Sequence, residues 1–379
     1  MAVTIPLKDL CTMDITDGTH KTPTYVEEGH IFLSSKNVTS GVIDWDNVMY
    51  IPASLHDELY KRIAPQKNDI LLAKNGTTGV AAIVDRDEVF DIYVSLALIR
   101  PDETKVLPRY LLHAINSYPT KQFFDSHLKG IGVPNLHLTH IRETPIRVPS
   151  FTEQKQITDV LDKVDELIAL RKKQLAKLDQ LVKSRFIEMF GDPVRNDKGW
   201  QQQAMDKVAP SSACSWDSPE SVWLLNLDMV EAQTGRIIDY LYVEKEQVGN
   251  STCGFDEGNV LYSKLRPYLN KVVVPTKKGY CTTELVPLRP NAKLNRQFLA
   301  YLLRSDAFVS FINEKVAGAK MPRVSMNVFR EFECILPPID LQNEFAAFVE
   351  QTDKSKVAIQ QSLDKLELLK KSLMQEYFG

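Results

Sequence analysis

Apolar side chains recur in alternating steps of four and three residues along two stretches of the chain, 151–191 and 339–379. This spacing is typical of a long helix that keeps one face against a partner helix. The positions on that face are Ile157, Leu161, Val164, Ile168, Arg171, Leu175, Leu178, Val182, Arg185 and Met189 in the first stretch and Phe345, Val349, Thr352, Lys356, Ile359, Leu363, Leu366, Lys370, Leu373 and Tyr377 in the second. The pattern predicts two rods, and about 37 helical residues make a rod of roughly 55 Å.

The two stretches also repeat one another. Gln174–Gly191 aligns without a gap on Ser362–Gly379, so that each residue of the first stretch is aligned with the residue 188 positions later. A polar position on the inward face of one copy corresponds to an apolar position in the other, as Arg171 does to Ile359. Such helices fit each other better than they fit themselves. We therefore expect an antiparallel pair within one chain, and the alternative is homodimerisation through either helix.

Both rods carry signals for helix ends. Thr152 and Asp340 have side chains that can accept from the free N–H groups of a first turn, so we expect them to be the N-caps. Gly191 and Gly379 can adopt the left-handed conformation that ends a helix. Each rod is therefore expected to have a defined start and a defined end.

The segments that precede the rods, 1–150 and 192–338, alternate short apolar runs with Gly, Asn, Asp and Pro. This alternation is typical of strands joined by turns. The strand pattern DILLAK at Asp69–Lys74 has its counterpart in NVLYSK at Asn259–Lys264. The chain therefore reads as a tandem duplication of mixed α/β (α+β) character. We predict two globular domains, 1–150 and 192–338, separated by two long antiparallel coiled-coil helices, 151–191 and 339–379, with pseudo-two-fold symmetry.

Bulk composition narrows the class of protein. The 379 residues are 44% hydrophobic and carry a formal net charge of −3, which predicts a globular protein with any basic surface confined to a local face. The sequence has no apolar run of about 18 residues, and MAVTIPLKDL does not resemble a leader, so we expect a cytoplasmic protein without a membrane partner. Five scattered cysteines favour reduced thiols over a disulfide framework or a zinc site.

Sequence motifs for catalysis are missing. The chain has no GxxxxGK[ST] phosphate loop, no HExxH, no GxSxG, and no Asn or Asp before Pro-Pro and an aromatic residue. Its seven histidines have no metal-ligand spacing. We therefore expect no catalytic residue, no metal and no cofactor on this chain.

Polar loops are the better candidates for function, because their side chains suit phosphates and base edges. The candidates are Lys74, Asn75, Thr77, Thr78, Lys129, Asn135 and His137 in the first domain and Lys264, Arg266, Tyr268, Lys271, Lys320 and Arg323 in the second. Asn135 and Arg323 occupy equivalent positions and suit adenine and guanine edges respectively. The alternatives are that the lysines are ordinary solvated charges and that the second loop merely closes each domain.

The order of these features resembles the DNA-specificity subunit of type I restriction-modification systems over essentially the whole chain. The resemblance rests on DILLAKNGTTG and NVLYSKLRPYLNK, then a GxxxP loop, then VPxxxEQ or LPxxDLQ at the start of a heptad helix that ends in MFGDP or EYFG. In contrast to other members, the chain enters its first recognition domain almost at once.

The resemblance implies a non-catalytic DNA-binding protein. Each of two target-recognition domains, 1–150 and 192–338, would read one half of a split, asymmetric DNA sequence, and the helices would set the unread spacer. The expected partners are double-stranded DNA, two modification subunits that carry S-adenosylmethionine and methylate adenine, and the restriction subunits bound through them. The alternative is a tandem coiled-coil adaptor or scaffold protein whose basic loops are incidental. A steep fall of DNA binding with salt would distinguish the two.

Overall fold

The computed structural model describes residues 2–128, 134–215, 221–316 and 322–379. Contacts divide the chain into two compact units, which we call unit 1 (Met1–Arg171 and Ser362–Gly379) and unit 2 (Lys172–Gln361). The division falls within the two long helices, because half of each helix packs into the core of each unit. None of the described helices is both long and apolar enough to cross a bilayer.

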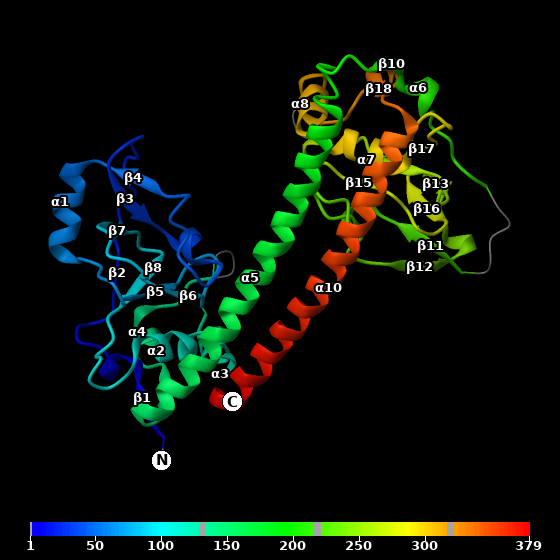
Figure 1. Ribbon diagram of the computed structural model, residues 1–379. Helices are drawn as coiled ribbons and strands as arrows, with labels where there is room; N and C mark the ends of the chain where they lie inside the picture. The colour runs from blue at the N-terminus through cyan, green and yellow to red at the C-terminus, as the bar shows by residue number, and fades with distance from the viewer. Residues whose placement is uncertain (1, 129–133, 216–220, 317–321) are drawn as a thin grey trace. The chain divides into compact units, whose positions relative to one another are not determined.

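The two rods are the helices α5 (Phe151–Phe190) and α10 (Ile339–Phe378), drawn in green and red in Figure 1. All the inward positions expected from the heptads are buried or half-buried. The helices begin one residue before the expected caps, which corrects that prediction: the Glu153 N–H donates to Ser150 Oγ at 3.3 Å, so Thr152 already lies in the first turn. Gly191 has the expected positive φ, 74°, whereas Gly379 does not.

Within each unit the two helices run antiparallel, as the sequence predicts. Residue numbers rise along α5 while those of its partners fall along α10. The contacts are Lys370–Asp165 (2.5 Å) and Arg171–Ser362 (3.2 Å) in unit 1, and Lys356–Asp179 (2.7 Å) and Arg185–Glu344 (3.1 Å) in unit 2.

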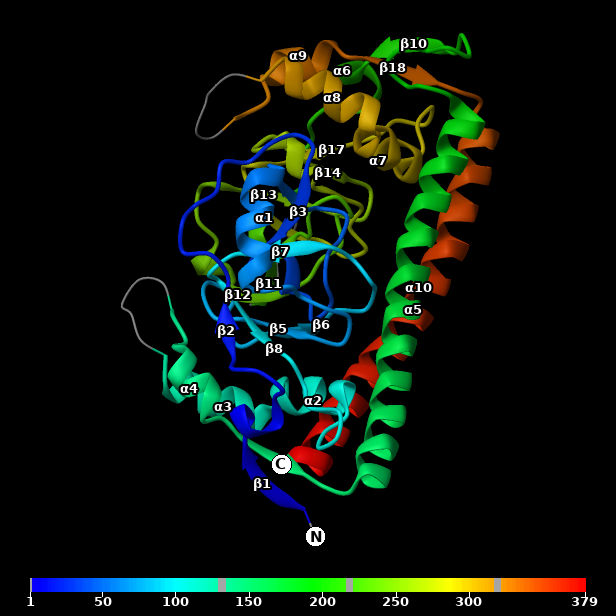
Figure 2. The same cartoon turned by 90° about the vertical axis from the view of Figure 1, so that its left-hand side faces the viewer.

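The described residues of unit 1 form three small sheets. Their strand orders are β2 (Thr16–Asp17), β8 (Leu96–Ile99), β5 (Ile70–Ala73), β6 (Ala81–Ile83); β4 (Met49–Ile51), β3 (His30–Leu33), β7 (Phe90–Ile92); and β1 (Val3–Pro6), β9 (Pro145–Val148). The helices are α1 (Ala53–Arg62), α2 (Pro108–Ile115), α3 (Tyr118–Ser126) and α4 (Leu138–Arg142), with 3-10 turns η1 (Leu7–Leu10) and η2 (Ser35–Val38). Figure 2 shows the last turns of α10, in red, near α2 in this unit, and Arg147 Nη1 of β9 donates to Tyr377 O at 2.6 Å.

Unit 2 repeats this plan. Its strand orders are β12 (Leu241–Glu244), β11 (Ser221–Leu225), β16 (Gly279–Thr282), β13 (Thr252–Phe255); β15 (Val272–Val273), β14 (Val260–Ser263), β17 (Leu285–Leu288); and β10 (Gln201–Ala204), β18 (Glu333–Leu336). Its helices are α6 (Met205–Val208), α7 (Arg296–Arg304), α8 (Asp306–Glu314) and α9 (Met326–Glu331), with 3-10 turns η3 (Leu227–Met229), η4 (Lys245–Gln247) and η5 (Pro267–Leu269). The mixed α/β duplication predicted from the sequence is therefore confirmed.

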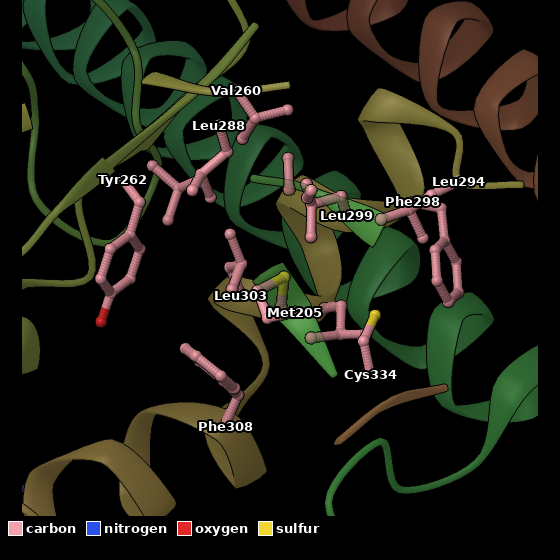
Figure 3. Packing of buried hydrophobic residues seen from close by; sticks show 14 of the residues in the cluster. Met205, Val260, Tyr262, Leu288, Leu294, Phe298, Leu299, Leu303, Phe308 and Cys334 are labelled. Atoms are coloured by element: carbon pink, nitrogen blue, oxygen red, sulfur yellow. The ribbon is translucent and has the colours of Figure 1, made fainter. Parts of the chain in front are cut away.

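The inner face of α7 forms the centre of the unit 2 core. Phe298, Leu299 and Leu303 from this helix pack with β14 and β17, as Figure 3 shows. The end of α5 adds Phe186 and Phe190 to the same cluster. Each fully buried side chain of this size contributes about 1.5–3 kcal/mol of transfer free energy, so the helix end is held firmly in its unit.

One buried glutamine joins each long helix to the globular part of its unit. In unit 1, Gln154 Oε1 accepts from the Leu107 N–H at 2.8 Å and Gln154 Nε2 donates to Pro149 O at 3.0 Å. In unit 2, Gln342 lies 188 positions later and makes the same bonds to the Asn295 N–H (2.9 Å) and Pro337 O (2.8 Å). The duplication thus extends to individual hydrogen bonds.

Candidate nucleic-acid interface

The structure brings the two candidate loops of each unit together at the end of a buried strand. In unit 1, Asn75 follows β5 and forms an isolated antiparallel bridge with Asn135. In unit 2, Leu265 follows β14 and forms the equivalent bridge with Arg323. The two units also have an equivalent main-chain hydrogen bond beside each bridge. The Leu136 N–H donates to Lys74 O at 2.8 Å in unit 1, and the Val324 N–H donates to Lys264 O at 2.9 Å in unit 2.

Lys74, one of the candidates, forms a buried ion pair. Its Nζ lies 2.9 Å from Asp17 Oδ2, and both side chains are less than a tenth exposed. A buried ion pair is costly to separate, because each charge would be left in a poorly solvated site. The ammonium group of Lys74 is therefore buried and stabilises the fold of unit 1 through its bond to Asp17.

The neighbouring asparagines carry unused hydrogen-bonding capacity. Asn75 Oδ1 and Asn135 Oδ1 are both buried, and neither has a hydrogen-bond partner among the described residues. Such an acceptor costs about 1–3 kcal/mol when left unsatisfied, so these two oxygens are candidates for a bond to water or to a ligand group.

The rest of the first turn is shaped by glycine. Gly76 and Gly79 have positive φ values of 77° and 81°, and the Thr78 hydroxyl donates to Gly76 O at 3.1 Å. Thr77 is exposed beside it. Of these two candidates, Thr77 is thus the one whose hydroxyl is free to contact DNA.

His137 lies at the start of α4, where its side chain is exposed. Its ring centroid is 6.4 Å from that of His140, in an edge-on arrangement. The candidates Lys129 and Lys320 lie outside the described residues. Within those residues, no group of three His, Cys, Asp or Glu is arranged to hold a metal ion.

In unit 2 the turn after β14 exposes two candidates. Arg266 adopts a left-handed conformation with φ 50°, and its main-chain N–H donates to Pro322 O at 2.8 Å. The residue is exposed. Tyr268 is 47% exposed. Lys264 is half-buried at the end of the strand.

Lys271, another candidate, is bonded to the main chain of its own unit. Its Nζ donates to Leu227 O at 2.8 Å and therefore fixes the 3-10 turn η3. Burial lowers the pKa of this lysine. Because its ammonium group is half-buried and occupied, we assign Lys271 to the support of the loop.

Glu284 is the residue that sequence reasoning missed. Its Oε1 lies 2.8 Å from Arg323 Nη2, while its Oε2 is buried without a partner, and its carbonyl accepts from the Lys264 N–H at 3.0 Å. The equivalent position in unit 1 is Ser95, whose carbonyl accepts from the Lys74 N–H at 2.9 Å. An alignment of the strands LALI and LVPL would have placed both residues beside the candidate loops.

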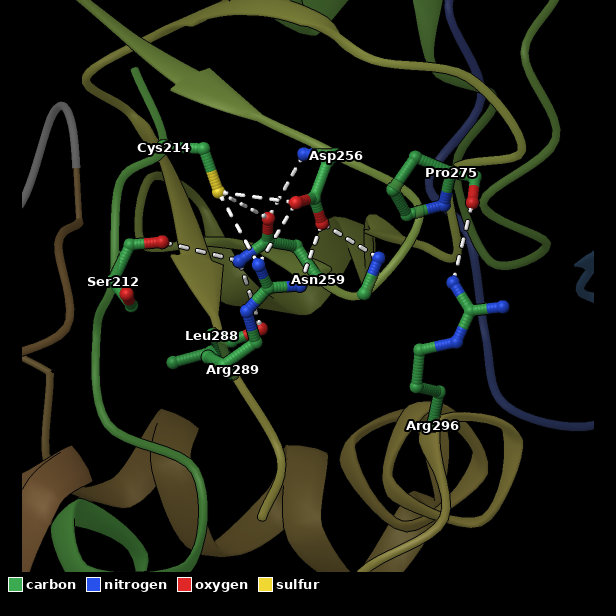
Figure 4. A network of polar contacts seen from close by, with 9 residues as sticks. Ser212, Cys214, Asp256, Asn259, Pro275, Leu288, Arg289 and Arg296 are labelled. Atoms are coloured by element: carbon green, nitrogen blue, oxygen red, sulfur yellow. Dashed lines mark hydrogen bonds and ion pairs between the residues drawn. The ribbon is translucent and has the colours of Figure 1, made fainter. Parts of the chain in front are cut away.

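A second polar network, shown in Figure 4, supports the far end of β14. Arg289 makes two bonds to Asp256, at 2.6 and 2.8 Å, and Asn259 Nδ2 donates to Ser212 O at 3.1 Å. The bonds from Arg289 lower the pKa of Asp256 to about 2 against the opposing effect of burial. Arg100 and Asp69 form the corresponding pair in unit 1, at 2.7 and 2.8 Å. These arginines therefore belong to the scaffold.

Comparison with known proteins places the chain in a recognised family. The family model described as type I restriction modification DNA specificity domain matches residues 4–180 and 209–369. The EcoDI specificity subunit of a type I restriction enzyme from Escherichia coli is 23% identical over 74% of this chain and 70% of its own length. The MjaVIII specificity subunit from Methanocaldococcus jannaschii is 21% identical over 83% and 79%. A solved type I restriction-modification S subunit from M. genitalium has the same fold, with TM-score 0.59, 14% identity, and coverage of 100% and 96%.

Proposed function

Because the chain belongs to the family of type I restriction modification DNA specificity domains, we propose that it is the DNA specificity subunit of a type I restriction-modification complex. Each unit reads one half of a bipartite, asymmetric DNA sequence. The observation that carries this proposal is the pair of equivalent bridges, Asn75 with Asn135 and Leu265 with Arg323. One backbone frame presents different side chains in the two units, as two different half-sequences require.

Unit 2 is suited to a half-sequence that contains guanine. An arginine can donate two hydrogen bonds to guanine O6 and N7. The side chain of Arg323 is 56% exposed, and Glu284 holds it at 2.8 Å, so its direction is set before DNA binds. The exposed guanidinium of Arg266 and the ring of Tyr268 supply phosphate and apolar contacts beside it.

Unit 1 is suited to a half-sequence that contains adenine. An asparagine amide can accept from the adenine N6 amino group and donate to N7. Asn75 and Asn135 each have a side-chain oxygen without a partner. A bond from the adenine N6 amino group to either oxygen would satisfy an acceptor that has no partner within the described residues.

The long helices set the number of unread base pairs. Both α5 and α10 run without a break through residues of both units. Deletion of one heptad from the half-buried middle of each helix is expected to change the spacer and to leave both half-sequences as they were. A folded deletion variant with an unchanged spacer would contradict this role.

The exposed sides of the same helices are proposed to bind the modification subunits. Leu181 and Leu369, which match across the duplication, are 49% and 46% exposed, and Leu368 is 68% exposed. The modification subunits supply S-adenosylmethionine and methylate adenine, and the restriction subunits join through them. Leu181→Lys and Leu369→Lys are expected to reduce co-purification of the modification subunit without changing the fold, because a charge replaces apolar contact area.

The direct test is to co-express the chain with its modification subunit in a host that lacks methylation and to map methylated adenines across the genome. A split sequence with a fixed spacer is the expected result. A soluble, co-purifying complex that produces no new methylation, together with DNA binding that does not fall with salt, would instead favour the adaptor role.

A further inference from the structure

Two cysteines of unit 2 face each other across a pair of strands. Cys253 on β13 and Cys281 on β16 are directly opposite partners in an antiparallel pair, and their Sγ atoms are 3.6 Å apart. Opposite residues in such a pair have Cα atoms about 4.5–5.5 Å apart, which lies inside the disulfide range of about 4.4–6.8 Å. We propose that this dithiol is a redox modification site that forms a reversible disulfide and thereby controls reading by unit 2.

The two thiols differ in the way that a redox pair requires. Cys253 is half-buried and within reach of a small oxidant, whereas Cys281 is fully buried. The two Sγ atoms are 3.6 Å apart, and either thiol can be the donor of the bond between them. This bond lowers the pKa of Cys253 against the effect of burial, with a further contribution from the charge of Lys264. The same bond, together with burial, raises the pKa of Cys281. Cys253 is therefore the attacking thiolate and Cys281 the resolving thiol.

A hydroperoxide is the co-reactant. The Cys253 thiolate attacks one oxygen of hydrogen peroxide, the O–O bond breaks, and hydroxide leaves, so that a sulfenic acid forms. Cys281 then attacks the sulfenic sulfur, the S–O bond breaks, and the oxygen leaves as water with the Cys281 proton. The two sulfurs are oxidised to one disulfide and the peroxide is reduced to water and hydroxide. A dithiol reductant reverses the reaction by exchange.

The dithiol is connected to the residues that face DNA in the proposed function. Both Sγ atoms lie within hydrogen-bonding distance of Leu285 O, at 3.7 Å for Cys253 and 3.5 Å for Cys281. The residue before Leu285 is Glu284, which binds the Lys264 N–H and the Arg323 side chain. A disulfide removes both S–H donors and draws the sulfurs from 3.6 Å to about 2.05 Å. The strand end that carries Glu284 must then shift, and Arg323 with it.

Unit 1 supplies an internal control, because Cys11 is the only cysteine in its sequence. Oxidation is therefore expected to affect the half-sequence of unit 2 and to spare that of unit 1. This consequence rests on the proposed function, whereas formation of the disulfide does not.

The chemical test uses the full chain in complex with its modification subunits. After treatment with stoichiometric hydrogen peroxide, peptide mass mapping is expected to find Cys253 joined to Cys281 with the loss of two hydrogens. Cys214→Ser is the matched control, since Cys214 is also half-buried in unit 2 but its thiol contacts Asp256, Asn259 and Arg289, and the change is expected to leave the disulfide intact. Peroxide that converts Cys253 to a sulfinic acid without any disulfide would overturn the proposal.

The functional test compares reduced and oxidised wild-type complex on DNA. Oxidation is expected to weaken binding about tenfold, the loss of roughly one base contact, and a dithiol reductant is expected to restore it. Cys253→Ala with Cys281→Ala is expected to bind DNA and to ignore peroxide. Equal binding by the oxidised and reduced wild type would overturn control of reading. A reduced complex that methylates no split sequence would instead refute the proposed function, and the mass mapping would still decide the disulfide.

Discussion

The two units fix their long helices by different means at equivalent positions. In unit 1, Asp162 of α5 accepts from Arg109 at 2.5 Å and from His113 at 2.8 Å, both on α2. In unit 2, the position of His113 is taken by Tyr301, whose ring meets that of Phe345 edge-on at 5.3 Å. We call each of these contacts between a long helix and the globular part of its unit a joint. The joint of unit 1 depends on charge and that of unit 2 on ring packing, so the duplicated backbone does not determine which side chains make the joint.

The aromatic joint of unit 2 is the more extensive one. Phe186, Phe190, Phe298 and Phe345 form a continuous cluster with ring centroids 4.7–5.5 Å apart. In unit 1, the rings of Tyr110 and Phe378 stand at the positions equivalent to Phe298 and Phe190, and their centroids are 5.5 Å apart. Aromatic pairs add about 0.5–1.5 kcal/mol each beyond the area they bury, so we expect the joint of unit 2 to be stronger and less sensitive to salt.

The largest effect is expected for Phe345→Ala. This change removes a fully buried ring that contacts three others, and it should lower the unfolding free energy of unit 2 by about 3–5 kcal/mol. Hydrogen exchange of α7 in the full chain measures the loss. Ile157→Ala at the equivalent position of unit 1 is the matched variant, and it should expose α2 and leave α7 protected. Loss of protection in both units from either change would contradict two separate joints.

The sequence was sufficient for the helices and the duplication, because both depend on spacing. A heptad pattern sustained over about forty positions strongly favours a long helix packed against a partner helix over any other structure. The joints were beyond reach of the same reasoning, since Asp162 lies outside the inward seam of α5 and meets Arg109 and His113 only after the chain has folded back. The caps at Thr152 and Asp340 were wrong because Ser150 and Pro338 provide earlier acceptors.

The shared glutamines predict equal effects in the two units. Gln154→Ala and Gln342→Ala each leave a buried backbone N–H and carbonyl groups unpaired, which should cost about 1–3 kcal/mol in the unit concerned. Urea unfolding followed by hydrogen exchange of α2 and α7 separates the two effects. Gln156→Ala, an exposed glutamine on α5, is the control and should be silent. A large effect in only one unit would show that the duplicated bonds are not equivalent in energy.

Candidate site residues were harder to predict than the fold, and the reason is burial. A lysine after a strand reads as a solvated charge, yet Lys74 is buried against Asp17, which lies 57 positions earlier in the chain. Nothing in the sequence around Glu284 marked it as a site residue, because its role comes from the ion pair with Arg323, which lies 39 positions later and reaches it only in the folded chain. Loop partners of this kind depend on tertiary pairing, whereas the loops themselves are marked by Gly, Pro and Asn.

Because the candidate loops of the two units carry different side chains, a change in one loop is expected to affect the reading of only one half-sequence. Arg323→Ala should weaken discrimination in one half-sequence by about 1–3 kcal/mol, and Asn135→Ala should do the same in the other half-sequence. Genome-wide mapping of methylated adenines reads both halves at once. Arg330→Ala, an exposed arginine on α9, serves as the control. An equal loss in both half-sequences from one variant would indicate a phosphate contact or misfolding.

The smallest effect is expected for the charged joint of unit 1, and it depends on pH. Burial opposes ionisation of Asp162, but the bonds from His113 and Arg109 prevail and lower its pKa to about 2. An unfolded aspartate titrates near pH 4, so this stabilisation is complete above about pH 4 and is lost as the pH falls toward 2. Asp162→Asn should therefore cost about 1 kcal/mol at pH 7 and progressively less below pH 4. Asp159→Asn, an exposed change three residues earlier on α5, should show no such dependence in the exchange of α2. A constant difference between the Asp162 variant and the wild type from pH 7 to pH 3 would mean that shape, and not charge, holds this helix.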